Sequence, residues 1–277
     1  MNIAVDIGNT RLKCGVFFSD EENEVAYLPL PLNGEKIEAS FVCQMLQWES
    51  LSDDEVSFGK TLTMDVYPTP ITWWIAPTGS FPWQDLKAEI LKVRPRDIFK
   101  IITQRQIPLS GFTVDSLAKV GIDRLLAVFA VVEKYGDVPM LIVDAGTAIT
   151  VDVVQNRIFC GGAILPGLTA MSSIYPKISE KLPLVPIPAP FSFSTDRPVY
   201  PGKNTEDAIR NGIYWGTIGA IRQFYDMFFP RTKQLILTGG DADYLMPGLS
   251  TIIPSRRIKR HDDLVLEGIH RYRCVAE

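Results

Sequence analysis

The feature of this 277-residue chain that most constrains its fold is an internal repeat. The segment VDIGNT at 5–10 is echoed by VDAGTA at 143–148, and the second aspartate follows the first by 138 residues, about half the chain. In each copy an apolar run ends in Asp, a turn with Gly and Thr follows, and another apolar run comes next. Two copies in the same strand-turn-strand setting predict two related halves of βββαβα type that face each other across a cleft.

Hydrophobic periodicity predicts alternating strands and helices in both halves. Proline removes a backbone donor and resists helix, so the six prolines between 183 and 201 predict an extended loop. A plain connector and a site-lining or interface role are equally open for that loop. The predicted strands are 3–5, 12–18, 25–30, 71–76, 98–102, 140–143, 149–154, 157–164 and 234–237, and the predicted helices are 36–48, 83–93, 123–135, 205–228, 264–272 and one that begins at 168.

Composition excludes several classes of protein. A net charge of −4 argues against a general nucleic-acid binder, and 46% hydrophobic with 22% charged residues is ordinary for a globular chain. The longest apolar run, 125–132, is far shorter than the roughly 20 residues of a membrane span, and the N-terminus lacks the basic region of a secretory signal. Four unpatterned cysteines and two histidines predict reduced thiols in the cytoplasm and no multi-histidine zinc site.

The first copy of the repeat suits a grip on phosphate groups. A glycine turn lets backbone N–H groups approach a phosphate, and a carboxylate just before it can hold Mg²⁺ against the same phosphates. Taken alone, this segment is more simply a hairpin turn, but the second copy favours the phosphate interpretation. Neither copy fits the P-loop or the G-x-G-x-x-G pattern, which disfavours those nucleotide folds. The residues concerned are Asp6, Gly8, Asn9, Thr10 and Lys13.

The segment GIDR at 121–124 places an acidic and a basic residue at the start of a strongly apolar helix. One interpretation is an N-cap Asp with a neighbouring Arg ion pair. The other is a carboxylate, Asp123, that accepts a proton from a substrate hydroxyl while Arg124 holds an anion. A helix N-terminus and an adjacent Arg both favour the ionised carboxylate. Spacing alone leaves the two interpretations open.

Three further segments carry weaker signals. The glycines of GGAILPGL at 161–168 indicate a close backbone approach or only a strand-to-helix turn, and TGGD at 238–241 could pass under a nucleotide base or ribose. The basic cluster at 256–260 is a nucleic-acid patch or, more simply, a solvated loop balanced by Asp262 and Asp263.

In combination these segments resemble the type III pantothenate kinases, of the actin/Hsp70/sugar-kinase superfamily, over nearly the whole chain. The segments that carry the resemblance are DIGNTRLKCGVF at 6–17, GIDR at 121–124, DAGTAIT at 144–150, GGAILPGL at 161–168, GKNTEDAIRNGI at 202–213 and TGGDA at 238–242. The resemblance implies an α/β fold of two duplicated ribonuclease H-like (actin-like ATPase) domains, 1–112 and 113–277, each a mixed sheet flanked by helices, with an interdomain cleft.

The resemblance also implies an activity, ATP-dependent phosphorylation of pantothenate to 4'-phosphopantothenate, the first step of coenzyme A biosynthesis. It implies a cytoplasmic homodimer that uses ATP, Mg²⁺ and a monovalent cation, K⁺ or NH₄⁺. By motif position, the resemblance implies that Asp123 is the general base and that Asp144 binds the monovalent cation. It implies that ATP and its phosphates are bound by Asp6 (with Mg²⁺), Gly8, Asn9, Thr10, Lys13, Gly146, Thr147 and Thr150. It implies that pantothenate is bound by Gly121, Asp123, Arg124 and, across the dimer interface, Thr205.

One departure from the family pattern concerns pantothenate binding. The family often has a Tyr seven residues before the Gly of GxDR and a Pro three residues after that Tyr, where this chain has Val114 and Leu117. The tyrosine contact to pantothenate is then lost or supplied by another residue, such as Tyr200 or Tyr175. Two alternative functions also stay open: another small-molecule kinase or phosphatase of the superfamily, and a nucleotide-binding transcription accessory factor.

Overall fold

The computed structural model describes residues 1–8, 11–17, 28–31, 47–48, 60–61, 69–187, 197–228 and 233–276. The chain forms two compact units, and each unit is assembled from more than one segment. The first contains Met1–Pro108, Ser116–Ala130 and Val265–Glu277, and the second contains Leu109–Asp115 and Val131–Leu264. A division of the chain at 112/113 stays a prediction.

The sheet of the first unit holds the first copy of the repeat. Its strands are β1 (Asn2–Ile7), β2 (Arg11–Phe17), β3 (Leu28–Pro31), β6 (Thr72–Ala76) and β7 (Ile98–Ile101), in the order β3-β2-β1-β6-β7. The odd-numbered residues of β1 pack with Leu86 and Ile90 of helix α2 (Trp83–Val93) in one hydrophobic core. Because side chains alternate along a strand, Asp6 lies on the opposite face of this sheet.

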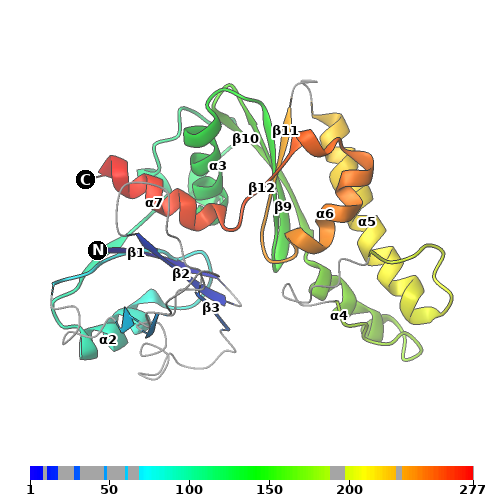
Figure 1. The fold of residues 1–277 in the computed structure, drawn as a ribbon, viewed down its shortest axis with the longest axis horizontal. Coiled ribbons are helices and arrows are strands. Elements are labelled where there is room, and N and C mark those ends of the chain that lie inside the picture. The colour runs from blue at the N-terminus through cyan, green and yellow to red at the C-terminus, as the bar shows by residue number, and fades with distance from the viewer. Residues whose placement is uncertain are drawn as a thin grey trace. The chain divides into compact units, whose positions relative to one another are not determined.

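The sheet of the second unit repeats this arrangement. Its strands are β8 (Met140–Ala145), β9 (Ala148–Gln155), β10 (Ile158–Pro166), β11 (Gln234–Thr238) and β12 (Ile258–Arg260), in the order β10-β9-β8-β11-β12. The odd-numbered residues of β8 pack in a core with helices α4 (Leu168–Ile178), α5 (Thr205–Met227) and α6 (Ala242–Ile252). Figure 1 shows α5 and α6 on one side of this sheet. Asp144 again lies on the opposite face.

The two sheets agree strand by strand. In each, the central strand pairs antiparallel with the next strand along the chain and parallel with the fourth. Asp6 lies opposite Lys13 on one side and Ala76 on the other, and Asp144 lies opposite Thr150 and Thr238. The predicted fold class, a mixed sheet flanked by helices in each half, is confirmed.

Along the chain, the last strand of each sheet is followed by a helix. These helices are α3 (Ile122–Tyr135), after β7, and α7 (Leu264–Ala276), after β12. Within the first unit, Gly268 of α7 lies so close to the Leu126 carbonyl of α3 that a Cβ would clash with it. Glycine at 268 therefore allows close packing of these two helices.

Most of the predicted elements are confirmed where the structure describes them. The predicted strand at 25–30 corresponds to β3, which covers 28–31. The helix predicted at 36–48 lies outside the described residues except for Gln47 and Trp48. For these two residues the prediction is wrong, because they form a short strand, β4, which pairs with β5 (Lys60–Thr61). Helix α6 and strand β12 were not predicted. Among the described residues, no helix is long and apolar enough to cross a membrane.

Candidate functional site

The first predicted phosphate turn is built around a buried carboxylate on β1. Asp6 is 5% exposed, and its Oδ2 lies 3.9 Å from Nζ of Lys13 on the neighbouring strand. The Oγ1 hydroxyl of Thr78, in the loop after β6, donates a hydrogen bond of 2.5 Å to Oδ1 of the same carboxylate. The structure therefore brings Asp6 and Lys13 together and adds Thr78, which the sequence analysis missed. Asn9 and Thr10 lie outside the described residues.

The thiol on the strand paired with β1 is not a nucleophile. Cys14 lies on β2 opposite Val5 and is buried. Burial, and then the negative charge of Asp6, raise the pKa of the Cys14 thiol far above its usual range. The thiol therefore stays protonated and packs as a small apolar group.

The second predicted phosphate turn, at the end of β8, is closed by backbone hydrogen bonds. Gly146 N donates to Ala148 O (3.1 Å), and Gly167 N donates to Thr147 O (3.1 Å). A Cβ on Gly167 would clash with the carbonyls of Gly146 and Thr147, so glycine is needed where the β10–α4 junction passes this turn. Both interpretations of the segment 161–168 apply at Gly167, which lies in the strand-to-helix turn and approaches the backbone at 146–147 closely. Thr150 is the β9 partner of Asp144.

The loop after β11 lies against the Asp144 carboxylate. Gly239 has a φ of +95°, and a Cβ there would clash with Asp144 Oδ1 and lie 2.5 Å from Ala145 O. Asp241 N donates to Ala145 O (2.9 Å). The first unit has the same bond at the equivalent place, since Gly79 N donates to Ile7 O (2.6 Å). In each half, the strand that pairs parallel with the central strand is followed by a loop, and a backbone N–H of that loop donates to the carbonyl of the residue after the repeated aspartate.

The proposed general base lies in the first turn of α3. Asp123 Oδ1 accepts a hydrogen bond from Arg124 N at 2.9 Å, and both side chains are half-buried. An ideal Cβ on Gly121 would clash with that same Oδ1. The Asp123 carboxylate therefore occupies the space that a side chain at position 121 would need, and Arg124 is the next residue of the helix.

The predicted role of Asp123 as general base implies that Gly121→Ala lowers kcat by up to about 100-fold. The added methyl group would displace the Asp123 carboxylate, and a ~1 Å misplacement of a reacting group has an effect of that size. The midpoint of thermal unfolding should change little, because Gly121 is exposed and precedes the helix. Steady-state kinetics and a melting curve on the same preparation check both statements. A variant with unchanged kcat would show that the close contact at 121 has no bearing on the reaction.

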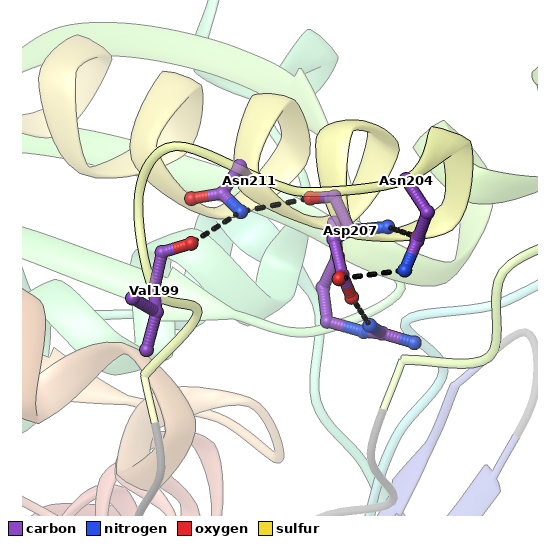
Figure 2. Close-up of polar contacts among 5 residues, drawn as sticks. Val199, Asn204, Asp207 and Asn211 are labelled. Atoms are coloured by element: carbon purple, nitrogen blue, oxygen red, sulfur yellow. Dashed lines mark hydrogen bonds and ion pairs between the residues drawn. The ribbon is translucent and has the colours of Figure 1, made fainter.

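Thr205, predicted to reach pantothenate across a dimer interface, is the exposed first residue of α5. The start of this helix is held by the Asn204 side chain, which accepts from Asp207 N (2.8 Å) and donates to Asp207 Oδ2 (2.9 Å). Figure 2 shows this cap and the Asn211 side chain, which donates to Val199 O (3.1 Å) and Asp207 O (2.8 Å). The segment before the helix is therefore fixed to its second turn.

The weaker sequence signals have local explanations. Arg260 forms ion pairs with Asp243 (2.8 Å) and Asp262 (3.8 Å), so part of the basic cluster at 256–260 is neutralised by neighbours. Val114, at the family's tyrosine position, contacts β10: a Cβ on Gly161, whose φ is +85°, would lie 3.3 Å from Val114 Cγ1.

The comparisons with known proteins identify the family. The sequence model of type III pantothenate kinases matches residues 2–227. The chain belongs to the type III pantothenate kinase family. The type III pantothenate kinase of Thermosynechococcus vestitus is 34% identical over 76% of each chain, and that of Synechococcus sp. JA-2-3B'a(2-13) is 31% identical over 85% of this chain and 91% of its own.

A solved structure adds the fold-level relationship. A candidate 2-dehydro-3-deoxygalactonokinase from Sinorhizobium meliloti superposes with a TM-score of 0.55 at 13% identity, over 99% of this chain and 96% of its own. At that identity the likeness concerns the fold alone. The chain thus shares the fold of this solved structure. Its membership of the type III pantothenate kinase family identifies it as a kinase that uses ATP.

The predicted site residues are divided between the two units. Asp6, Lys13, Gly121, Asp123 and Arg124 belong to the first, and Asp144, Gly146, Thr147, Thr150 and Thr205 belong to the second. The oxygen donors at the two repeated aspartates suit the binding of hard cations. A carboxylate and a hydroxyl meet at Asp6, and the Asp144 carboxylate and the Ala145 carbonyl each lie close to Gly239. Oxygen ligands of this kind suit Mg²⁺ and other hard cations.

Proposed function

We propose that the protein phosphorylates the primary hydroxyl of pantothenate with Asp123 as the general base and Arg124 as the partner of the pantothenate carboxylate. The reaction class follows from the family: ATP-dependent phosphorylation of pantothenate in coenzyme A biosynthesis. The observation that carries the assignment of roles is the Asp123 carboxylate, which is fixed by Arg124 N and by contact with Gly121. A fixed carboxylate beside an arginine can accept a proton from an alcohol whose anionic end is bound nearby.

The phosphate groups of ATP are assigned to the two repeated turns. In the first, Lys13 supplies positive charge, Gly8 lets the backbone approach, and Asn9 and Thr10 are included by motif position. In the second, Gly146, Thr147 and Thr150 surround the turn that Gly167 supports. Phosphoryl transfer depends mainly on such positioning and on charge stabilisation.

The two repeated aspartates are assigned to cations. Asp6 would hold Mg²⁺, which would supply positive charge to neutralise the phosphate groups of ATP. Asp144 would hold a monovalent cation, K⁺ or NH₄⁺, together with oxygen atoms of its turn. The two carboxylates have different surroundings, because Asp6 lies 3.9 Å from the Lys13 ammonium group, short of a close ion pair, whereas Asp144 lies against Gly239.

A cytoplasmic homodimer, in which Thr205 contacts pantothenate bound to the partner, is part of the same proposal. Exposed apolar side chains on α4 and on the segments beside it support an interface there, and a mass measurement in solution tests it. These side chains are Ile174, Ile178, Leu184, Val199 and Tyr200. Tyr200 is exposed and Tyr175 packs against the core of the second unit, and either is available for the tyrosine contact that Val114 does not make.

The purified protein should release ADP from ATP when pantothenate, Mg²⁺ and K⁺ are all present, and much less when any one is omitted or when Na⁺ replaces K⁺. The same assay with sugars and short-chain hydroxy acids tests the alternative of another small-molecule kinase. Mass spectrometry of the product should show pantothenate with one added phosphate. ATP binding without phosphorylation of pantothenate would instead favour a nucleotide-binding regulator.

A further inference from the structure

The loop between β6 and α2 presents a hydroxyl group to the Asp6 carboxylate from a fixed position. Thr78 lies two residues after Ala76, the parallel neighbour of Asp6, and its Oγ1 donates the 2.5 Å bond to Asp6 Oδ1. The next residue, Gly79, is tied to Ile7 O by its backbone N–H. The hydroxyl is therefore held in place by the sheet rather than by a loose loop.

The two oxygens of Asp6 have different neighbours. Oδ1 accepts from Thr78, while Oδ2 faces Lys13 Nζ at 3.9 Å, near the outer limit of an ion pair. The bond to Oδ1 restricts the side-chain torsion of Asp6 and so helps to keep Oδ2 at that separation. Without it, the carboxylate could turn toward Lys13, since attraction between opposite charges grows as they approach in a buried setting. A carboxylate in a close ion pair is a poorer ligand for a metal ion.

The second half shows that this hydroxyl is not a general requirement of the fold. The sheet register aligns Ala76 with Thr238, so the position equivalent to Thr78 is Gly240, which has no hydroxyl. There the aspartate lies against Gly239 instead. The hydroxyl contact therefore belongs to the Asp6 copy of the turn.

We propose that Thr78 is a positioning residue that holds the Asp6 carboxylate in the orientation that binds the divalent metal ion of the ATP complex. The inference rests on the proposed assignment of Asp6 to Mg²⁺. Groups that orient a metal-binding carboxylate typically change metal affinity by about 10- to 100-fold when removed. Thr78→Val should weaken metal binding by that factor, and Thr78→Ser, which keeps the hydroxyl, should stay within about threefold of the parent protein.

The test measures Mn²⁺ bound in the presence of ADP, by electron paramagnetic resonance, for the parent protein, Thr78→Val and Thr78→Ser. The control is Thr251→Val, which removes a hydroxyl that donates only to Gly248 O (2.7 Å) within α6 and should leave Mn²⁺ affinity unchanged. Melting curves confirm folding, and kinetics should show a raised Mg²⁺ requirement for Thr78→Val that saturating Mg²⁺ largely restores.

The proposal is overturned if Thr78→Val binds Mn²⁺ as the parent protein does, if Thr78→Ser loses as much affinity, or if Thr251→Val shows the same loss. The readout is independent of pantothenate. A parent protein that binds Mn²⁺ and ADP but does not phosphorylate pantothenate would contradict the proposed function and still leave the role of Thr78 open to measurement in this way.

Discussion

Asp123→Asn is expected to lower kcat by at least about 100-fold while ATP binding is retained. The substitution keeps the size and shape of the side chain and one oxygen that can accept from Arg124 N, but an amide cannot take a proton from the substrate hydroxyl. The effect should therefore appear in kcat and not in the affinity for ATP. Steady-state kinetics with pantothenate, combined with calorimetric titration of ATP, separates the two quantities.

A matched control for this experiment is Asp85→Asn. Asp85 lies in the first turn of α2, as Asp123 lies in the first turn of α3, and it is exposed. Both substitutions remove a negative charge near a helix N-terminus, which has a stability effect of about 0.3–1 kcal/mol at an exposed site. If Asp123→Asn loses no more activity than Asp85→Asn, the carboxylate at 123 is only a helix-end charge and the base must be another group.

The internal repeat made much of this fold predictable from sequence. Two strands ending in Asp, each followed by a Gly-Thr turn, predicted two related halves, and the two sheets have the same strand order. The pairing of Asp6 with Lys13 was also within reach, because their strands are close in sequence and pair antiparallel, which places the two residues opposite one another. Local sequence patterns report such contacts well because the partners are only a few residues apart.

Helix α6 shows why other elements escaped prediction. Its sequence contains Pro247 and Gly248, both unfavourable in a helix interior by local propensity. Tertiary packing overrides that propensity: the glycine lets the helix approach α5, where Gly248 N donates to the Tyr214 hydroxyl (2.9 Å). A contact of this kind is set by a residue 34 positions away and leaves no periodic signal.

Thr78 escaped prediction for a related reason. It is separated from Asp6 by 72 residues, and no motif marks it. The register of β1 against β6 brings the two together, and that register is fixed by the whole sheet. The sequence holds only an indirect signal for Thr78: the segment TGGD at 238–241 predicts a ligand contact in the second half, and the segment after the strand 71–76 occupies the equivalent place in the first half.

A buried ion pair near α2 carries the largest expected effect on stability. The Arg94 and Asp97 side chains are both fully buried, with Arg94 Nε 2.7 Å from Asp97 Oδ2. The same carboxylate accepts from Ile71 N (3.0 Å) and from the indole Nε1 of Trp73 (2.7 Å). Arg94 Nη2 also donates to Thr69 O (2.9 Å). The pair thus ties the turn after α2 to the start of β6.

Asp97→Ala should lower the free energy of unfolding of the first unit by about 3–5 kcal/mol, because it leaves the Arg94 charge buried without its partner. It also leaves the donors at Ile71 and Trp73 without their acceptor. Urea unfolding followed by tryptophan fluorescence measures the change, with Trp73 as a local reporter. Should Asp97→Ala fail to fold, Asp97→Asn keeps the shape and allows a smaller loss to be measured.

Glu89→Ala is the control that distinguishes the buried pair from an ordinary one. Glu89 and Lys92 form a 2.6 Å ion pair on the outer side of the same helix, where the lysine side chain is 62% exposed. An exposed pair of this kind contributes about 0–1 kcal/mol, because water and salt screen its charges. Asp97→Ala should therefore lower the free energy of unfolding several-fold more than Glu89→Ala does. The loss for Asp97→Ala should also change little with added salt. Equal losses would mean that burial at 94 and 97 adds nothing to the interaction, contrary to the cost of removing a charge's partner inside a protein.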